Sequence, residues 1–185
     1  MKWFHSREQN ELQQYRNQFA SSYEIEEAFA DHGGYLYWIA LLITGDAESA
    51  SRSIVNATEL CSKNSGVFRD WLGRWARSAT VRIAIAEVRE QITKAASRYE
   101  FAPYGDSYQK LLSEDEIAAL RLLDPQEIIA SLGPLARCIL VLRGVQHASI
   151  SNCALFLELP RRVVTSAYCE AGRWAAAQTK AAQIC

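Results

Sequence analysis

Residues 140–174 read LVLRGVQHASISNCALFLELPRRVVTSAYCEAGRW. The apolar helix predicted at the start of this stretch ends at Gly144, and Ser149 is placed to cap a second helix. Glu158-Leu159-Pro160 then predicts a tight turn before a third helix that begins at Arg161. Two short helices joined by a turn form the helix-turn-helix that reads DNA. An ordinary packed helical hairpin would give the same pattern.

The last of these helices has a predicted buried stripe and a predicted outer face. Val164, Tyr168 and Ala171 follow the i, i+4, i+7 spacing of a buried stripe. Cys169 then falls on the outer face, where a recognition helix carries its contacts to the DNA groove. The candidate DNA contacts on that face are Arg161, Arg162, Thr165 and Ser166. From residue 125 onward six Lys and Arg stand against three Glu, so this half is the better candidate for binding DNA.

Two further stretches lie far upstream. Residues 35–50 read YLYWIALLITGDAESA, and residues 68–79 read FRDWLGRWARSA. Together they resemble the promoter-opening domain of bacterial RNA polymerase sigma factors of the extracytoplasmic-function group. In that group one helix ends in Leu-Thr-Gly-Asp, and a later one carries Phe-Arg-x-Trp-Leu-x-x-Ile-Ala-Arg-Asn. Residues 132–137 and 140–143 are similar to the run that opens the group's second domain, and the resemblance spans about residues 29–174.

The resemblance implies an all-α protein in which a linker joins two small helical domains. Residues 1–34 would form an N-terminal helical extension and residues 35–94 a three-helix domain of the promoter-opening type. Residues 95–124 would form a linker with a short helix, and residues 125–185 the helix-turn-helix domain. The residue pattern agrees, because the apolar period lapses after residue 95 and resumes at a capping box formed by Ser113 and Glu116.

Apolar stripes predict which faces of the upstream helices are buried. Three helices are expected near residues 35–43, 47–61 and 67–88, and their stripes should pack as a bundle. The second helix has the stripe Ala50, Ile54, Ala57 and Cys61. The third has the stripe Phe68, Trp71, Leu72, Trp75, Ala79 and Ile83, so both tryptophans are expected in the core. The N-terminal segment has a similar stripe, expected to pack on the first domain, at Trp3, Phe4, Leu12, Tyr15, Phe19 and Tyr23.

The resemblance also implies core RNA polymerase and promoter DNA as partners. The second helix would bind the polymerase through an exposed face that offers Ser51, Arg52, Ser53, Val55, Asn56 and Glu59. The following loop and third helix would hold opened promoter DNA along a basic edge made of Lys63, Asn64, Arg69, Arg74, Arg77 and Arg82. Holding an extruded base requires aromatic stacking and backbone cations that offset the cost of unstacking.

Several positions depart from the pattern of the group. Ser51-Arg52 replaces an acidic pair on the polymerase-binding helix, which changes the charge presented to that partner. On the recognition helix, Thr165, Ala167 and Glu170 stand where Lys or Arg are usual, which weakens attraction to phosphates. Three interpretations stay open: a working sigma factor, a sigma-like module that binds a regulator such as an anti-sigma factor, and a dimeric helix-turn-helix regulator.

Cysteine and histidine placement argues against a catalytic or metal site. The five cysteines, four expected to be buried and Cys185 not, lack any Cys-x-x-Cys spacing. The three histidines lie far apart, and none has a neighbour suited to catalysis. We therefore expect neither an enzyme nor a cofactor or metal site. The chain also lacks a secretory signal and a run of about 18 apolar residues, so a cytoplasmic protein without a membrane span is expected.

Overall fold

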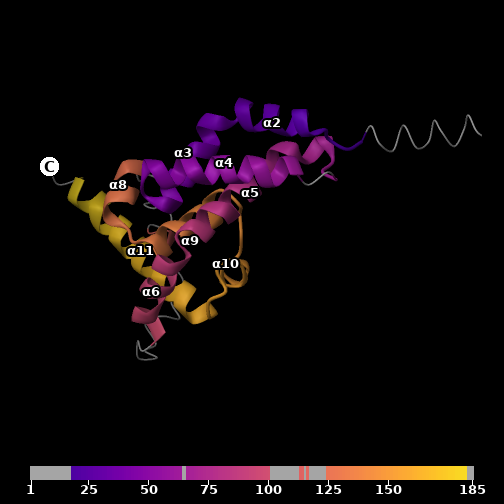
Figure 1. Ribbon diagram of the computed structural model, residues 1–185. Helices are drawn as coiled ribbons and strands as arrows, with labels where there is room; N and C mark the ends of the chain where they lie inside the picture. The colour runs from indigo at the N-terminus through magenta and orange to yellow at the C-terminus, as the bar shows by residue number, and fades with distance from the viewer. Residues whose placement is uncertain (1–17, 64–65, 101–112, 115, 117–123, 183–185) are drawn as a thin grey trace, which may run out of the picture.

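The computed structural model describes residues 18–63, 66–100, 113–114, 116 and 124–182. Within them the regular elements are helices, which confirms the expected all-α class. In chain order (Figure 1) these are α2 (Ser22–Asp31), α3 (Gly33–Thr44), α4 (Ala47–Lys63), the 3-10 turn η1 (Arg69–Trp71), α5 (Leu72–Glu87), α6 (Arg89–Glu100), α8 (Pro125–Ser131), α9 (Pro134–Gly144), α10 (Ile150–Leu157) and α11 (Arg161–Ala182). No helix in the described residues is both long and apolar enough to span a membrane.

Helices α3, α4 and α5 pack against one another as the predicted bundle, and α2 lies across α4 and α5. The predicted stripe of α4 is confirmed, because Ala50, Ala57 and Cys61 are buried and Ile54 is partly buried. At the start of α2 the Ser21 hydroxyl accepts a hydrogen bond from the Glu24 amide, and the Glu24 carboxylate accepts one from the Ser21 amide. This capping box fixes where α2 begins.

The predicted stripe of the third helix is wrong at its start. Trp71 is 62% exposed and Phe68 is 41% exposed, whereas Trp75 is partly buried. The residues of α5 that are buried are Ala76, Thr80, Val81, Ala84 and Ile85. The buried positions differ from the predicted stripe because residues 69–71 form a 3-10 turn and the α-helix begins only at Leu72.

The expected N-terminal stripe does not continue through residue 19 as a helix. Phe19 forms an antiparallel bridge with Phe68, and α2 begins only at Ser22. Tyr23 is exposed, and α2 buries Ile25 and Phe29 instead. Trp3, Phe4, Leu12 and Tyr15 lie outside the described residues. The expected packing of the N-terminal segment on the first bundle is confirmed for α2.

The helical pattern continues past residue 95, because α6 (Arg89–Glu100) runs to Glu100 and buries Ala96. The predicted capping box is present: the Glu116 carboxylate accepts from the Ser113 amide at 2.7 Å, and the Ser113 hydroxyl accepts from the Glu116 amide at 3.3 Å. Residues 117–123 lie outside the described part of the chain. Helix α8 then starts with Pro125 at its first turn, capped by the Asp124 side chain.

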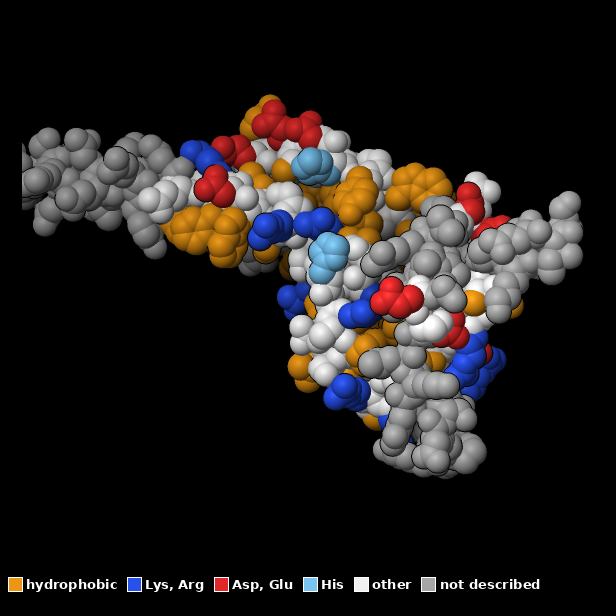
Figure 2. All heavy atoms as spheres, turned by 180° about the vertical axis from the view of Figure 1, so that it is seen from behind, with side chains coloured by type: hydrophobic (Ala, Val, Ile, Leu, Met, Phe, Trp, Pro, Cys, Tyr) orange, Lys and Arg blue, Asp and Glu red, His pale blue; other side chains and the backbone are white. Residues whose placement is uncertain are grey.

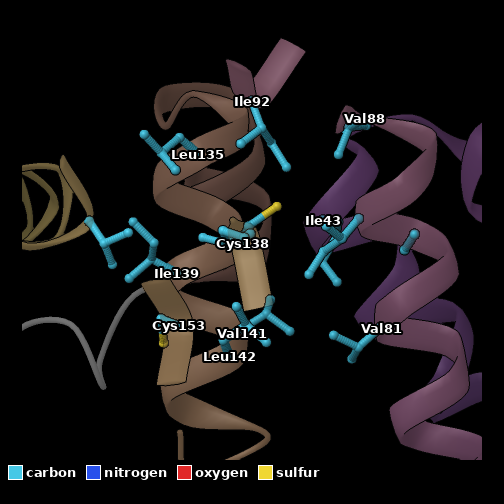
Figure 3. Close-up of a cluster of buried hydrophobic side chains, with 14 of the residues drawn as sticks. Ile43, Val81, Val88, Ile92, Leu135, Cys138, Ile139, Val141, Leu142 and Cys153 are labelled. Carbon is cyan, nitrogen blue, oxygen red and sulfur yellow. The ribbon is translucent and has the colours of Figure 1, made fainter. Parts of the chain in front are cut away.

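One of the two hydrophobic core clusters spans both halves of the chain, and the other lies within the first half. A continuous cluster of buried side chains joins Ile43 of α3 and Val81 of α5 to Cys138 and Val141 of α9, and extends to Val164 of α11. Figure 3 shows the side chains of α3 and α5 facing those of α9 across this junction. The helices therefore pack as one body, and the division into domains at residues 34, 94 and 124 stays a prediction.

A buried arginine reinforces the junction between the halves. Arg137 of α9 is 7% exposed, and its guanidinium donates to the carbonyls of Leu132 at 2.9 Å and Thr44 at 3.2 Å. It approaches the turn after α3 so closely that a Cβ added to Gly45 would lie 2.6 Å from Arg137 Nη2. Gly45 also has a φ of +81°, in the left-handed region. This contact joins two stretches, residues 44–46 and 132–137, that the sequence pattern had singled out separately.

The four cysteines within the described residues are buried, as predicted. Burial raises the pKa of the Cys61 thiol to about 11 and that of Cys138 to about 12. Cys185 lies outside the described residues. The buried thiols act as small apolar side chains of the core.

Candidate nucleic-acid and partner surfaces

Helices α10 and α11 form the predicted helix-turn-helix layout. The Ser149 hydroxyl accepts from the Asn152 amide at 3.1 Å and caps α10. Glu158 ends this helix in the left-handed conformation, with a φ of +56°, and the Leu159 amide returns to the Ala154 carbonyl at 3.0 Å. Pro160 then precedes α11. The expected cap and turn are therefore both confirmed.

The outer face of α11 is less accessible than expected. Arg161 and Arg162 are exposed, and Thr165 is partly buried with its hydroxyl donating to the Arg161 carbonyl at 2.9 Å. Ser166 is only 7% exposed and Cys169 only 2%, so their expected place on the outer face is wrong. The accessible candidates are therefore the two arginines at the helix N-terminus, a position that suits phosphate oxygens.

Helix α11 buries those residues because it has neighbours on more than one side. The Tyr99 hydroxyl of α6 donates to the Glu170 carboxylate at 2.7 Å. Helix α11 packs against α9 and α10 as well as α6, and burial raises the pKa of the Cys169 thiol. An apolar stripe in the sequence predicts that a helix is buried against one neighbour. Contacts with distant parts of the chain leave no such local pattern, so the sequence did not predict them.

The turn of the helix-turn-helix is attached to the first half of the chain. Arg89, at the start of α6, donates to the Leu157 carbonyl at 2.8 Å and pairs with the Glu158 carboxylate at 3.3 Å. The arginine therefore connects the C-terminal end of α10 to the start of α6.

The expected polymerase-binding face of α4 is exposed except at one residue. The exposed members are Ser51, Arg52, Val55, Asn56 and Glu59. Ser53 is fully buried and its hydroxyl donates to the Ser49 carbonyl at 2.7 Å, so its expected place on this face is wrong. Because the buried Ser53 side chain is small, α4 can lie close to the rest of the bundle at this position.

Arg52 does not present an uncompensated positive charge. Its guanidinium pairs with Glu48 on the same helix and with Glu87 of α5, the latter at 2.8 Å. The hydrogen bond that Arg52 donates to Glu87, with the charges of both carboxylates, raises the pKa of Arg52. Because two carboxylates surround one guanidinium, this part of the face is acidic on balance, although residue 52 itself is basic.

The predicted basic edge divides into paired and unpaired cations. Lys63 pairs with Glu59 at 3.3 Å, and Arg69 pairs with Glu24 at 2.7 Å, whereas Asn64 lies outside the described residues. The unpaired cations, which make no ion pair or hydrogen bond with any residue the structure describes, are Arg74, Arg77 and Arg82 of α5. They are the strongest candidates for a phosphate backbone.

An aromatic patch lies at the start of this helix and is formed by the exposed Phe68 and Trp71 together with the partly buried Phe19. The rings of Phe19 and Phe68 stack with centroids 4.8 Å apart, and Trp71 lies 6.0 Å from Phe68 at a tilted angle. Two hydrogen bonds flank the patch, from the Ala20 amide to the Val67 carbonyl and from the Arg69 amide to the Gln18 carbonyl. Figure 2 shows hydrophobic side chains at this end of the molecule, followed by Lys and Arg side chains along the same face.

A groove of about 1100 Å³ continues from the basic edge toward α10. It lies between α5, which contributes Trp75 and Arg82, and α10, which contributes Asn152 and Phe156. Arg89 also lines it, at the point where that side chain holds the turn of the helix-turn-helix. The groove therefore connects the candidate surfaces of the two halves.

Comparison of the chain with protein-family models, with curated proteins and with solved structures gave no match. In the part of the chain that the structure describes, no three His, Cys, Asp or Glu side chains gather as a metal site would require. The candidate function therefore depends on the geometry of the surfaces described above and on the sequence resemblance.

Proposed function

We propose that this chain is a sigma-factor-like transcription initiation protein that binds core RNA polymerase and promoter DNA. The observation that carries the proposal is the aromatic patch next to unpaired arginines. Trp71 is exposed beside Phe68, and Arg74, Arg77 and Arg82 follow on α5. Promoter opening exposes single-stranded bases, and aromatic rings combined with cations bind such bases without needing a closed pocket.

The helix-turn-helix would supply the double-stranded contacts. Arg161 and Arg162 are exposed at the positive end of α11, where they can reach phosphates or the edge of guanine. The α4 face would bind the polymerase. Its apolar center includes Val55 and Leu60, both at least half exposed, and its acidic balance around Arg52 suits a basic partner surface.

A second candidate function is a sigma-like module that binds a regulator protein and has lost strong DNA or polymerase binding. The burial of Ser166 and Cys169 favours it, because α11 then offers DNA few accessible side chains beyond its first turn. The hydrogen bonds that Arg89 and Tyr99 donate also favour the second candidate, because they connect the helix-turn-helix to the first half of the chain.

Competition for core RNA polymerase distinguishes the two candidates. Purified protein is mixed with bacterial core polymerase at low and moderate salt, and a known sigma factor is added as competitor. Under the first candidate the chain binds and the competitor displaces it. Absence of binding under every condition would refute the initiation role and leave the interaction module.

The patch itself is tested with a single-stranded oligonucleotide and two matched tryptophan variants. Stacking of one base on an aromatic side chain contributes about 1–3 kcal/mol, so Trp71→Ala should weaken binding by about fivefold or more. Trp38→Ala removes another exposed tryptophan, from α3, and should leave the affinity unchanged. Equal affinities for both variants, measured by fluorescence anisotropy, would exclude stacking on Trp71.

A further inference from the structure

The groove between α5 and α10 continues the basic edge in a regular row. Arg74, Ser78 and Arg82 follow one another at intervals of four residues, so they lie about one turn apart on the same side of α5. Ser78 and Arg82 line the groove, and Arg74 lies between the aromatic patch and Ser78 along the chain. The cations of this wall therefore lead from the patch into the groove.

The side chains that line the groove carry a positive charge on balance. Glu158 is the one carboxylate among its described lining residues, and Arg89, which also lines the groove, pairs with it at 3.3 Å. Arg82 is exposed and makes no ion pair with any residue that the structure describes. An anionic ligand is therefore favoured here.

The aromatic and amide side chains of the groove suit nucleobases. Asn152 of α10 is exposed, and its amide can both donate and accept hydrogen bonds. Trp75 of α5 and Phe156 of α10 are partly buried, so part of each ring remains accessible from the groove. Leu155, which is 76% exposed, adds an apolar contact of the kind that suits the thymine methyl group. Aromatic rings combined with cations are typical of sites for single-stranded nucleic acid.

The size of the groove favours an extended ligand. Its volume of about 1100 Å³ exceeds the range of about 300–1,000 Å³ that is typical of small-molecule sites. Its lining comes from α4 and α5 in the first half of the chain and from α9 and α10 in the second. A ligand that fills the groove therefore contacts both halves.

We propose that the single DNA strand bound at the aromatic patch continues along this groove, with phosphates at Arg74 and Arg82 and bases against Trp75, Asn152 and Phe156. Helix α10 of the helix-turn-helix then holds the opened strand together with the first half. This inference rests on the proposed function, because it extends the strand that the patch is proposed to bind.

Fluorescence anisotropy with a labelled oligothymidine of about 12 nucleotides tests this path in the full chain at about 0.15 M salt. Asn152→Glu places a negative charge in the groove and should weaken binding by at least about fivefold. Ser151→Glu is the matched control and should change the affinity by less than about twofold, because Ser151 is exposed on the same turn of α10 but does not line the groove. A carboxylate is favourable in the first turn of a helix, so both variants should fold.

Photo-crosslinking locates the strand directly. An oligothymidine that carries 4-thiothymidine is irradiated in complex with the full chain, which is then digested with trypsin. Crosslinks should appear on peptide 70–74, which carries Trp71, and on peptide 144–161, which carries the whole of α10.

Trp71→Ala separates failure of the path from failure of the proposed function. If this variant binds weakly but Asn152→Glu and Ser151→Glu bind equally, the patch stands and the path is overturned, which leaves the groove to an acidic protein segment. Absence of a crosslink to peptide 144–161 would overturn the path in the same way. If Trp71→Ala binds as the unmodified chain does, or if oligothymidine does not bind at all, the proposed function fails and the path fails with it.

Discussion

Gly45→Ala tests the contact that joins the two halves of the chain. Gly45 follows α3 with a φ of +81°, and a Cβ at this position would lie 2.6 Å from Nη2 and 2.9 Å from Cζ of Arg137. The end of an arginine side chain can usually move away. Here it is held by carbonyls on two sides, from Thr44 and from Leu132, so moving it breaks hydrogen bonds in the core.

The expected loss of stability follows from two costs and one smaller offset. An alanine in the left-handed region costs about 1–2 kcal/mol. Displacing Arg137 removes a charge-assisted hydrogen bond to the end of α3, which contributes about 1.5 kcal/mol or more. The lower entropy of alanine in the unfolded chain offsets part of this, by about 0.5 kcal/mol. The free energy of unfolding should therefore fall by about 2–3 kcal/mol.

Urea denaturation followed by circular dichroism measures the change. Gly34→Ala is the matched control: Gly34 lies in α3, has an ordinary φ, and an added Cβ would meet nothing within 4 Å. That substitution should stabilise the protein by up to about 1 kcal/mol. If Gly45→Ala changed the free energy of unfolding by less than about 0.5 kcal/mol, the tight contact with Arg137 would be refuted.

Three further predictions concern single side chains. The pKa of Glu24 is lowered from 4.5 to about 2, mainly by the Ser21 amide and then by Arg69, so its contribution to stability is present above pH 4.5 and is lost as the pH falls toward 2. The stability difference between the unmodified chain and Glu24→Gln, from urea midpoints at several pH values, should therefore shrink over that range; a constant difference would contradict this. Glu158→Gly should stabilise the protein by up to about 1 kcal/mol in the same assay, because glycine adopts the left-handed conformation freely and the exposed pair with Arg89 contributes little; a clear loss would mean that the pair matters more than the strain. Burial raises the pKa values of Cys61, Cys138, Cys153 and Cys169, so in a Cys185→Ser variant a thiol reagent at pH 8 should react only as fast as the protein unfolds; rapid reaction of the folded protein would show that a thiol is accessible.

Local patterns predicted the elements of the fold well. Ser149 caps α10, Glu158 turns the chain before α11, and the alanines of α4 lie in the core, because each feature depends on residues only a few positions apart. The capping box at Ser113 was predictable for the same reason.

Features that depend on distant residues were not predictable. Trp71 is exposed because it lies in a 3-10 turn next to the bridge between Phe19 and Phe68. The 3.6-residue period of an α-helix does not predict such a turn. The charge of Arg52 is compensated by Glu87, which lies 35 positions away. Ser166 is buried although the apolar stripe of α11 placed it outside. In each case a tertiary neighbour, rather than a local preference, decides the outcome.

The shared core has a consequence for how the chain can be divided. Ile43 and Val81 on one side, and Cys138 and Val141 on the other, bury their surfaces against each other across the junction. A protease site engineered between Glu100 and Ser113 would therefore cut the backbone without separating the interior. The two fragments should stay together without a covalent link and unfold in a single transition, because each contributes side chains to the hydrophobic core that buries the other.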